Sequence, residues 1–320
     1  MGKIFVNQLQ RGQAVETTFL VREKTLAKTK AGLPYLSLRL GDRTGEIEGR
    51  IWENVQEFSP LFEKDDFIKV RADVDEFQGA LQLRISKLRR LDESEVFLEE
   101  FLPQTSQDIE AMLKDLKAVC QGVQNPFLRT LLELFLTDES FLAKFKLAPA
   151  AKTLHHVYLG GLLEHTHALV QLILLVGPRY RGVNMDLLIT GGILHDIGKI
   201  DELSFHRSFD YTDAGRLVGH ILLTAERVEK KIQEIPDFPE PLAMQLKHIL
   251  LSHHGEYDFG SPRRPKTLEA LLLHHLDDLD AKMNGFWTWI EKEKDLPSRW
   301  TSFHRTYDRF IFKPEEVNSD

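Results

Sequence analysis

The sequence predicts a chain of two folds, a small N-terminal β-barrel followed by an all-α helical bundle. Three observations lead to this prediction. Short stretches that alternate apolar and polar residues, as strands do, fill residues 14–90. From residue 106 onward, apolar residues recur at helical spacing. The histidines follow the same division, because none occurs before residue 155 and all but one of the 13 lie between residues 155 and 275.

Composition places the chain among globular proteins and bounds its chemistry. At 320 residues there is room for two domains, and 42% hydrophobic with 28% charged residues is typical of a soluble protein. The single cysteine, Cys120, excludes a disulfide framework and a cysteine-based zinc site. The first residues lack the apolar core of a signal peptide, and the longest apolar run, residues 169–176, is too short to span a bilayer. We therefore expect a cytoplasmic protein without a membrane partner.

The N-terminal strands follow the order of a small Greek-key barrel. We expect strands at residues 15–26, 35–40, 47–52, 67–74 and 80–85, with a short helix at residues 54–62 between the third and fourth. Three strands, a helix and two strands are the order of an OB-fold, which we assign to residues 1–92. Many such barrels bind single strands on one face through aromatic side chains and cations.

Several barrel residues are candidates for contacting a nucleic-acid strand. They are aromatic or basic, the types that stack on bases or neutralise phosphates: Phe19, Tyr35, Trp52, Phe77, Arg39, Arg50 and Arg84. The alternative is structural, with Phe19 and Trp52 as core residues and the arginines as solvated surface. At any single position the sequence does not decide between these interpretations.

The remainder of the chain is expected to be helical. Residues 93–149 are assigned to a connector that packs on the C-terminal domain, residues 150–312 to that domain, and residues 313–320 to a flexible tail. Asn125-Pro126 predicts a helix cap followed by proline at the first helical position. The predicted helices cover residues 108–123, 127–136, 138–145, 150–176, 187–195, 212–235, 241–252 and 267–294.

The chemistry centres on His195-Asp196, which ends a buried helix. A buried unpaired charge is costly, and a metal ion can satisfy both side chains. Neighbouring side chains on a helix point about 100° apart, so the pair can hold two sides of one metal centre. Lys199 lies four residues after His195 on the same face and can meet a phosphate. For an isolated dipeptide, hydrogen bonds alone would be the simpler explanation.

Further polar residues occupy helix positions that usually hold core residues. They are His165, His220, His253-His254 and Asp277. Several of them on separate helices are better explained by one shared ion site than by separate hydrogen bonds. Imidazole and carboxylate ligands without thiolates suit Mn, Fe, Co or Zn. The candidates exceed the needs of one catalytic ion, so we expect a two-metal site of the kind that cleaves phosphate esters.

The order of these motifs resembles the metal-dependent HD phosphohydrolase superfamily, and His220 and His253 resemble its two-metal members. The sequence around these motifs is similar to that of the bacterial YhaM-type 3′→5′ exoribonucleases. Members of that family pair an N-terminal OB-fold with a C-terminal HD domain. The segments that carry this resemblance are residues 160–166, 191–203, 219–221, 252–257 and 279–283. It covers nearly the whole chain, although the barrel is matched by strand order only.

The resemblance implies a manganese- or cobalt-dependent hydrolase, with Fe²⁺ and Zn²⁺ as alternatives, that shortens single-stranded RNA from its 3′ end to nucleoside 5′-monophosphates. Single-stranded DNA as a further substrate and a homo-oligomeric state are left open. The metal ligands implied are His165, His195, Asp196, His220, His253 and Asp277. Asp196, Lys199 and His254 are the expected catalytic residues, with His254 either a further nitrogen ligand or a substrate contact.

Some assignments remain open in the sequence. Asp278 rivals Asp277, because the pattern does not fix the phase of that helix. Arg207 is a second candidate for contacting phosphate. The histidines at positions 155, 156 and 167 are as much structural as functional candidates.

Two other functions compete with the exoribonuclease. One is a nucleotide phosphohydrolase with the barrel as a regulatory module, which a fused barrel disfavours because a mononucleotide hydrolase does not need it. The other is a single-strand nucleic-acid-binding factor with a vestigial HD domain, which the intact ligand set disfavours.

Overall fold

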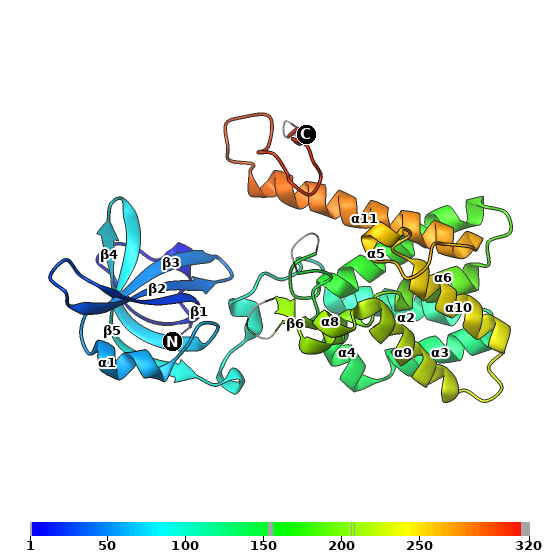
Figure 1. The fold of residues 1–320 in the computed structure, drawn as a ribbon, viewed down its shortest axis with the longest axis horizontal. Coiled ribbons are helices and arrows are strands. Elements are labelled where there is room, and N and C mark those ends of the chain that lie inside the picture. Colours follow the sequence, from blue (N-terminus) through cyan, green and yellow to red (C-terminus); the bar gives the residue numbers. More distant parts are fainter. Residues whose placement is uncertain (1, 153–155, 206, 208, 315–320) are drawn as a thin grey trace. The chain divides into compact units, whose positions relative to one another are not determined.

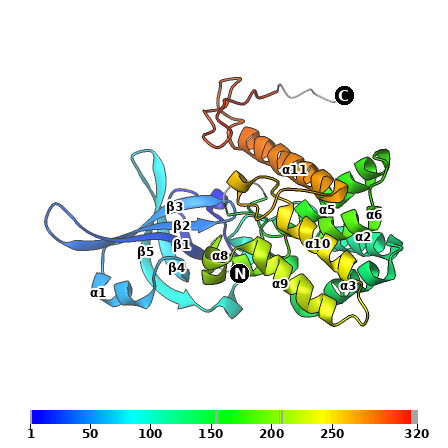
Figure 2. The same cartoon turned by 45° about the vertical axis from the view of Figure 1, so that its right-hand side comes forward.

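The computed structural model describes residues 2–152, 156–205, 207 and 209–314, which form two compact units (Figures 1 and 2). One unit contains the described residues up to 104 together with residue 207, and the other contains the remaining described residues from 105 onward. This division corrects our expectation that residues 93–104 pack on the helices. Phe101 is instead buried against Phe67 in the first unit, with the ring centroids 4.8 Å apart.

The first unit is a closed barrel with strands in the order β1-β2-β3-β5-β4. The strands are β1 Ala14–Lys28, β2 Pro34–Asp42, β3 Gly45–Ile51, β4 Phe67–Phe77 and β5 Ala80–Leu91. The helix α1, Val55–Phe58, and a 3₁₀ turn, Ser59–Leu61, connect β3 to β4. Parallel pairing of β3 with β5 closes the barrel, and the prediction of an OB-fold is confirmed.

The barrel core follows from alternation along the middle of the strands, as the stretch from Ile68 to Val74 of β4 shows. Along β4, buried apolar residues alternate with polar residues that face outward. The turn from β4 to β5 consists of Gln78 and Gly79, whose φ angles of 53° and 82° match a two-residue hairpin turn. This turn therefore determines which residues of β4 and β5 are paired.

The second unit is built from helices, as predicted. They are α2 Ile109–Gly122, α3 Pro126–Leu136, α4 Glu139–Phe145, α5 Gly161–Val176, α6 Met185–Leu194, α7 Lys199–Glu202, α8 Asp213–Leu217, α9 His220–Gln233, α10 Glu240–Ser252 and α11 Leu268–Lys292. The strands β6, Leu203–Ser204, and β7, Asp210–Tyr211, pair after α7. α5 packs on α2, α6 and α11, and α10 packs on α6, α9 and α11. Among the described residues, no helix combines the length and apolar character that a membrane span requires.

Three details of the helical unit differ from the prediction. The helix expected from residue 150 begins at Gly161, and the helix expected over residues 212–235 is broken between α8 and α9. Gly160 and Gly219 have φ angles of 80° and 81°, which a right-handed helix cannot accommodate. Lys313, expected to begin a flexible tail, is buried, and its Nζ donates to two backbone carbonyls at 2.7 and 2.8 Å. Residues 315–320 lie outside the described part of the chain.

Candidate functional site

Close packing of α6 brings the helices that carry polar residues together. A Cβ on Gly191 would lie 2.7 Å from an isoleucine of α10, and one on Gly192 would lie 2.5 Å from an isoleucine of α5. Glycine permits this approach without displacing either neighbour. α6 therefore ends deep between the helices, and the next two residues, His195 and Asp196, are buried.

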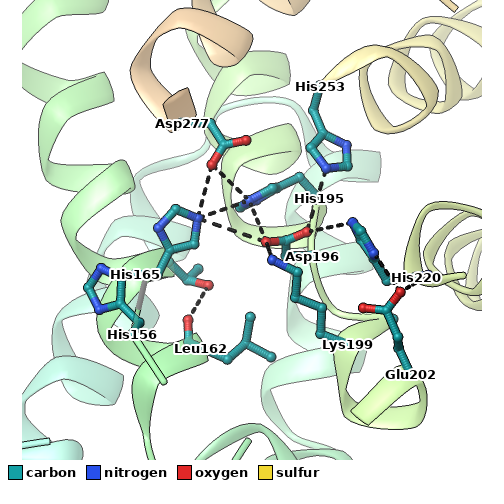
Figure 3. Close-up of polar contacts among 12 residues, drawn as sticks. His156, Leu162, His165, His195, Asp196, Lys199, Glu202, His220, His253 and Asp277 are labelled. Carbon is teal, nitrogen blue, oxygen red and sulfur yellow. Dashed lines mark hydrogen bonds and ion pairs between the residues drawn. The ribbon is translucent and has the colours of Figure 1, made fainter. Parts of the chain in front are cut away.

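One cluster of metal-ligand atoms surrounds Oδ2 of Asp196 (Figure 3). The Nε2 atoms of His165 and His195 lie 3.3 Å apart, and they are 3.9 and 3.2 Å from this oxygen. Oδ1 of Asp277, on α11, lies 3.1 Å from Nε2 of His165. Two imidazoles and two carboxylates thus converge, a set that suits one divalent transition-metal ion.

A second cluster surrounds the other oxygen of the same carboxylate. His220 begins α9 and His253 follows α10, and their Nε2 atoms lie 3.4 and 3.5 Å from Oδ1 of Asp196. These three atoms are buried, and none of them has a hydrogen-bond partner among the described residues. Buried polar atoms without partners are rare and costly. Three of them facing one another fit a bound cation, and the two oxygens of Asp196 face one cluster each.

Backbone carbonyls orient two of the four imidazoles. Nδ1 of His195 and Nδ1 of His253 each lie within 2.9 Å of the carbonyl oxygen three residues earlier in the chain. A carbonyl only accepts, so each Nδ1 carries the proton and donates it. The Nε2 atoms that face the centre are therefore unprotonated in the neutral rings, as a metal ligand must be.

Carboxylates orient the other two imidazoles. Oδ2 of Asp280 lies 2.7 Å from Nδ1 of His165, and Oε1 of Glu202 lies 2.9 Å from Nδ1 of His220. Sequence reasoning missed both carboxylates. The sequence did contain a signal for Asp280. This residue is three positions after Asp277, and helical spacing therefore places both carboxylates on one face. No local pattern indicated the role of Glu202, because only the tertiary fold brings α7 to the start of α9.

The electrostatics of the centre favour a cation. Burial lowers the pKa of His165, but hydrogen bonds to Asp277 and Asp280 outweigh burial and raise this pKa to about 10. Burial raises the pKa of Asp196, but attraction to His195 and Lys199 outweighs it and holds the pKa of Asp196 well below its usual range. The carboxylates thus stay ionised and attract positive charge, which a proton or a metal ion supplies.

Two further predicted residues lie at the edge of this centre. Nζ of Lys199 lies 2.6 Å from Oδ2 of Asp196. His254 lines a cavity of about 340 Å³ beside the centre, and its ligand atom lies within 4.8 Å of those of His220 and His253. Burial and the neighbouring His253 lower the pKa of His254 to about 3, so its ring is neutral. This position suits either role expected for it.

The phase of α11 separates the two rival aspartates. Asp277 faces His165, whereas Asp278 lines the neighbouring cavity and forms an ion pair with Lys282 at 2.7 Å. The structure therefore brings Asp277, and not Asp278, to the imidazole cluster.

The three histidines with open roles divide between core and surface. His156 is buried, and its ring nitrogens lie 2.8 Å from a tyrosine hydroxyl and 3.3 Å from Asp280. It therefore supports the carboxylate that orients His165. His167 lies at the surface beside Asp115, at 3.4 Å. His155 lies outside the described residues.

Four of the residues predicted to contact a nucleic-acid strand lie on one face of the barrel. The rings of Tyr35 and Trp52 are stacked with centroids 4.7 Å apart, and Trp52 is 49% exposed. The guanidinium of Arg50 lies 5.6 Å from the centre of the Tyr35 ring. Arg84 and Trp52 line one groove of about 370 Å³. This face combines aromatic surfaces with cations, as single-strand binding requires.

The other predicted contacts lie elsewhere. The prediction that Phe19 contacts a nucleic-acid strand is wrong. Phe19 occupies an inward position of β1 and is fully buried in the barrel core, where no base can reach it. Arg39 is exposed between two glutamates at 3.7 and 3.8 Å, and Phe77 is 61% exposed at the end of β4. Arg207 forms an ion pair with Asp66 at 3.0 Å in the barrel unit.

Comparison with known proteins matches both units to families. A family model described as HD domain matches residues 162–282, and one described as OB-fold nucleic acid binding domain matches residues 20–91. The chain is 33% identical over 305 residues to the 3′-5′ exoribonuclease YhaM of Geobacillus sp. (strain WCH70), covering 95% of this chain and 93% of the relative. It is 32% identical over 306 residues to the 3′-5′ exoribonuclease YhaM of Bacillus subtilis (strain 168), covering 95% and 96%.

Proposed function

The chain belongs to the family of the 3′-5′ exoribonuclease YhaM, and from this premise we propose that it is a metal-dependent hydrolase that shortens single-stranded RNA from its 3′ end and releases nucleoside 5′-monophosphates. The observation that carries the metal dependence is the trio of buried, unpartnered ligand atoms on Asp196, His220 and His253. The 3′ direction rests on the family.

The two clusters fit two divalent ions, for which we propose Mn²⁺ or Co²⁺. His165, His195, Asp277 and one oxygen of Asp196 would hold the first, and the other oxygen would hold the second. The second ion would also bind His220 and His253. When bound, such a pair acidifies a water molecule and neutralises charge on the phosphoryl oxygens.

The other side chains position the substrate and the ligands. Lys199 is held by Asp196 and offers its ammonium group to a phosphate oxygen at the centre. Phe259 is 62% exposed and lines the cavity beside Asp196, where its ring can stack on the terminal base. Asp280 and Glu202 fix the rings of His165 and His220, so each Nε2 stays directed at the centre.

A comparison of linear and circular RNA tests this function. A linear RNA labelled at its 5′ end should give a ladder of shortening labelled products in the presence of Mn²⁺, because residues leave from the 3′ end. A circular RNA of the same sequence should persist, since it offers no end, and EDTA should stop the reaction.

Other outcomes would favour the competing functions. Cleavage of the circle, or early release of the 5′ label as a mononucleotide, would contradict 3′→5′ digestion. Hydrolysis of nucleoside triphosphates with RNA left intact would identify a nucleotide phosphohydrolase. A parallel reaction with single-stranded DNA of the same sequence measures the preference of the enzyme for ribose over deoxyribose.

Removal of the stacked rings should weaken RNA binding. The double variant Tyr35→Ala/Trp52→Ala is expected to raise the KM for long RNA at least about tenfold, because base stacking contributes roughly 1–3 kcal/mol per base. The matched control is Trp287→Ala, which removes a tryptophan of similar exposure, 58%, from the helical unit. Unchanged KM in the barrel variant would exclude the stacked rings from substrate binding.

A further inference from the structure

A second charged surface of the barrel lies on the outer side of β4 and β5. Antiparallel pairing sets Lys69 opposite Arg89 and Arg71 opposite Lys87, and all four side chains reach solvent. Directly opposite residues point to the same side of a sheet with Cβ atoms about 5 Å apart. With Glu16 of β1, these residues line a groove of about 320 Å³, which we call the basic groove.

The strand β5 connects the basic groove to the aromatic face. Near the middle of β5, Arg84 and Ser86 line the groove that also contains Trp52. The pairing with β4 shifts by one residue at Ser86, which is a β-bulge. Past the bulge the outward positions belong to Lys87 and Arg89. Polar and cationic side chains therefore follow β5 without interruption from one groove to the other.

Much of the positive charge in the basic groove is available to a ligand. Lys69 pairs with Glu16 at 2.7 Å, and Arg89 pairs with a glutamate at 2.8 Å. Exposed pairs of this kind are weak, so a phosphate can compete for both cations. Over the part of the chain that the structure describes, Arg71 and Lys87 form no ion pair. The net charge of the chain is −8, so this concentration of cations runs against its overall charge.

We propose that the basic groove is a second RNA contact, which binds the sugar-phosphate backbone of the strand whose bases stack on Tyr35 and Trp52. The inference rests on the proposed function. Cations two residues apart on a strand are separated by about 6.6 Å, comparable to successive phosphates of an extended strand. Four cations line the groove together with Glu16, Val70 and Leu88, and no aromatic residue does, which suits backbone contact without base stacking. Continuity along β5 favours nucleic acid over an acidic protein segment.

The test measures RNA binding to the full chain with EDTA present, so that the strand is not cut. It uses a short RNA of about 5 nucleotides and a long one of about 25, because one OB-fold covers roughly 4–16 nucleotides. The variant Arg71→Ala/Lys87→Ala should bind the long RNA several-fold more weakly than the unchanged chain. Its plot of log K against log salt concentration should be shallower by about 0.7 for each phosphate contact removed. The affinity gained between the short and the long RNA should shrink in the same variant.

Two control variants separate this contact from a general effect of charge. Arg71→Lys/Lys87→Arg preserves the cations and should preserve the salt dependence. Lys114→Ala/Lys117→Ala removes the same charge from α2 and should leave it unchanged. An equal loss in this α2 variant, or no change in Arg71→Ala/Lys87→Ala, would overturn the second contact. If Tyr35→Ala/Trp52→Ala then still weakens binding, the proposed function stands and only the basic groove fails. A chain that binds no RNA contradicts both.

Discussion

Replacement of Asp196 by alanine is expected to abolish RNA hydrolysis while the helical unit stays folded. One oxygen of this carboxylate faces His165 and His195, and the other faces His220 and His253. The substitution therefore takes a proposed metal ligand from both clusters. Because metal ions supply several kcal/mol of transition-state stabilisation, activity should fall by at least about a thousandfold. The measurements are cleavage of 5′-labelled RNA and metal content per chain after dialysis.

Two further variants sharpen this experiment. Asp196→Asn keeps the size of the side chain but loses its charge, so it should be as inactive as the alanine variant. Asp115→Ala removes an exposed carboxylate from α2 and should keep both activity and metal. Circular dichroism checks that each variant is folded. Turnover at the unchanged rate with equal metal loading in Asp196→Ala would refute the bridging role.

The substitution Gly198→Ala should disrupt the same centre without touching a ligand. A Cβ on Gly198 would lie 2.4 Å from the backbone carbonyl of His220 and 2.7 Å from the backbone nitrogen of Thr224. Neither backbone atom can move alone, so α9 must shift and carry His220 with it. Overpacking of this kind typically costs about 1–3 kcal/mol of unfolding free energy. A displacement of about 1 Å at an active site can lower the rate about 100-fold.

The control for this variant is Gly122→Ala. Gly122 ends α2, and a Cβ there would meet no atom within 4 Å, so stability and rate should hold or improve slightly. Urea unfolding measures stability, and initial rates at saturating Mn²⁺ measure activity. If Gly198→Ala retained full stability and rate, α7 and α9 would have to be less tightly packed than the structure indicates.

Local patterns predicted most of the architecture, because they record which side of each element is buried. Strand alternation predicted the barrel order, and the His195-Asp196 pair at the end of a buried helix predicted the centre. Gly160 and Gly219 also carried a local signal, since glycine often lies where a helix starts or ends, but the apolar spacing around them masked it.

The remaining features depend on contacts between distant segments. Phe19 shows this for the barrel, because an aromatic residue in a strand fits the core and the surface equally well until the direction of the strand is fixed. The choice between Asp277 and Asp278 needed the rotation of α11, which packing on α5, α6 and α10 sets. Glu202 supports His220 only through the path of the chain between α7 and α9.

The proposed metal ligands lie far apart along the chain, so they are synthesised at different times. His165 comes from α5 near the start of the helical unit, and Asp277 comes from α11 near its end. A chain is made from its N-terminus and its domains fold as units in that order. A nascent chain therefore holds a complete barrel well before it holds the full ligand set. If the barrel binds RNA as proposed, a nascent chain could therefore bind RNA before the residues proposed for hydrolysis have all been made.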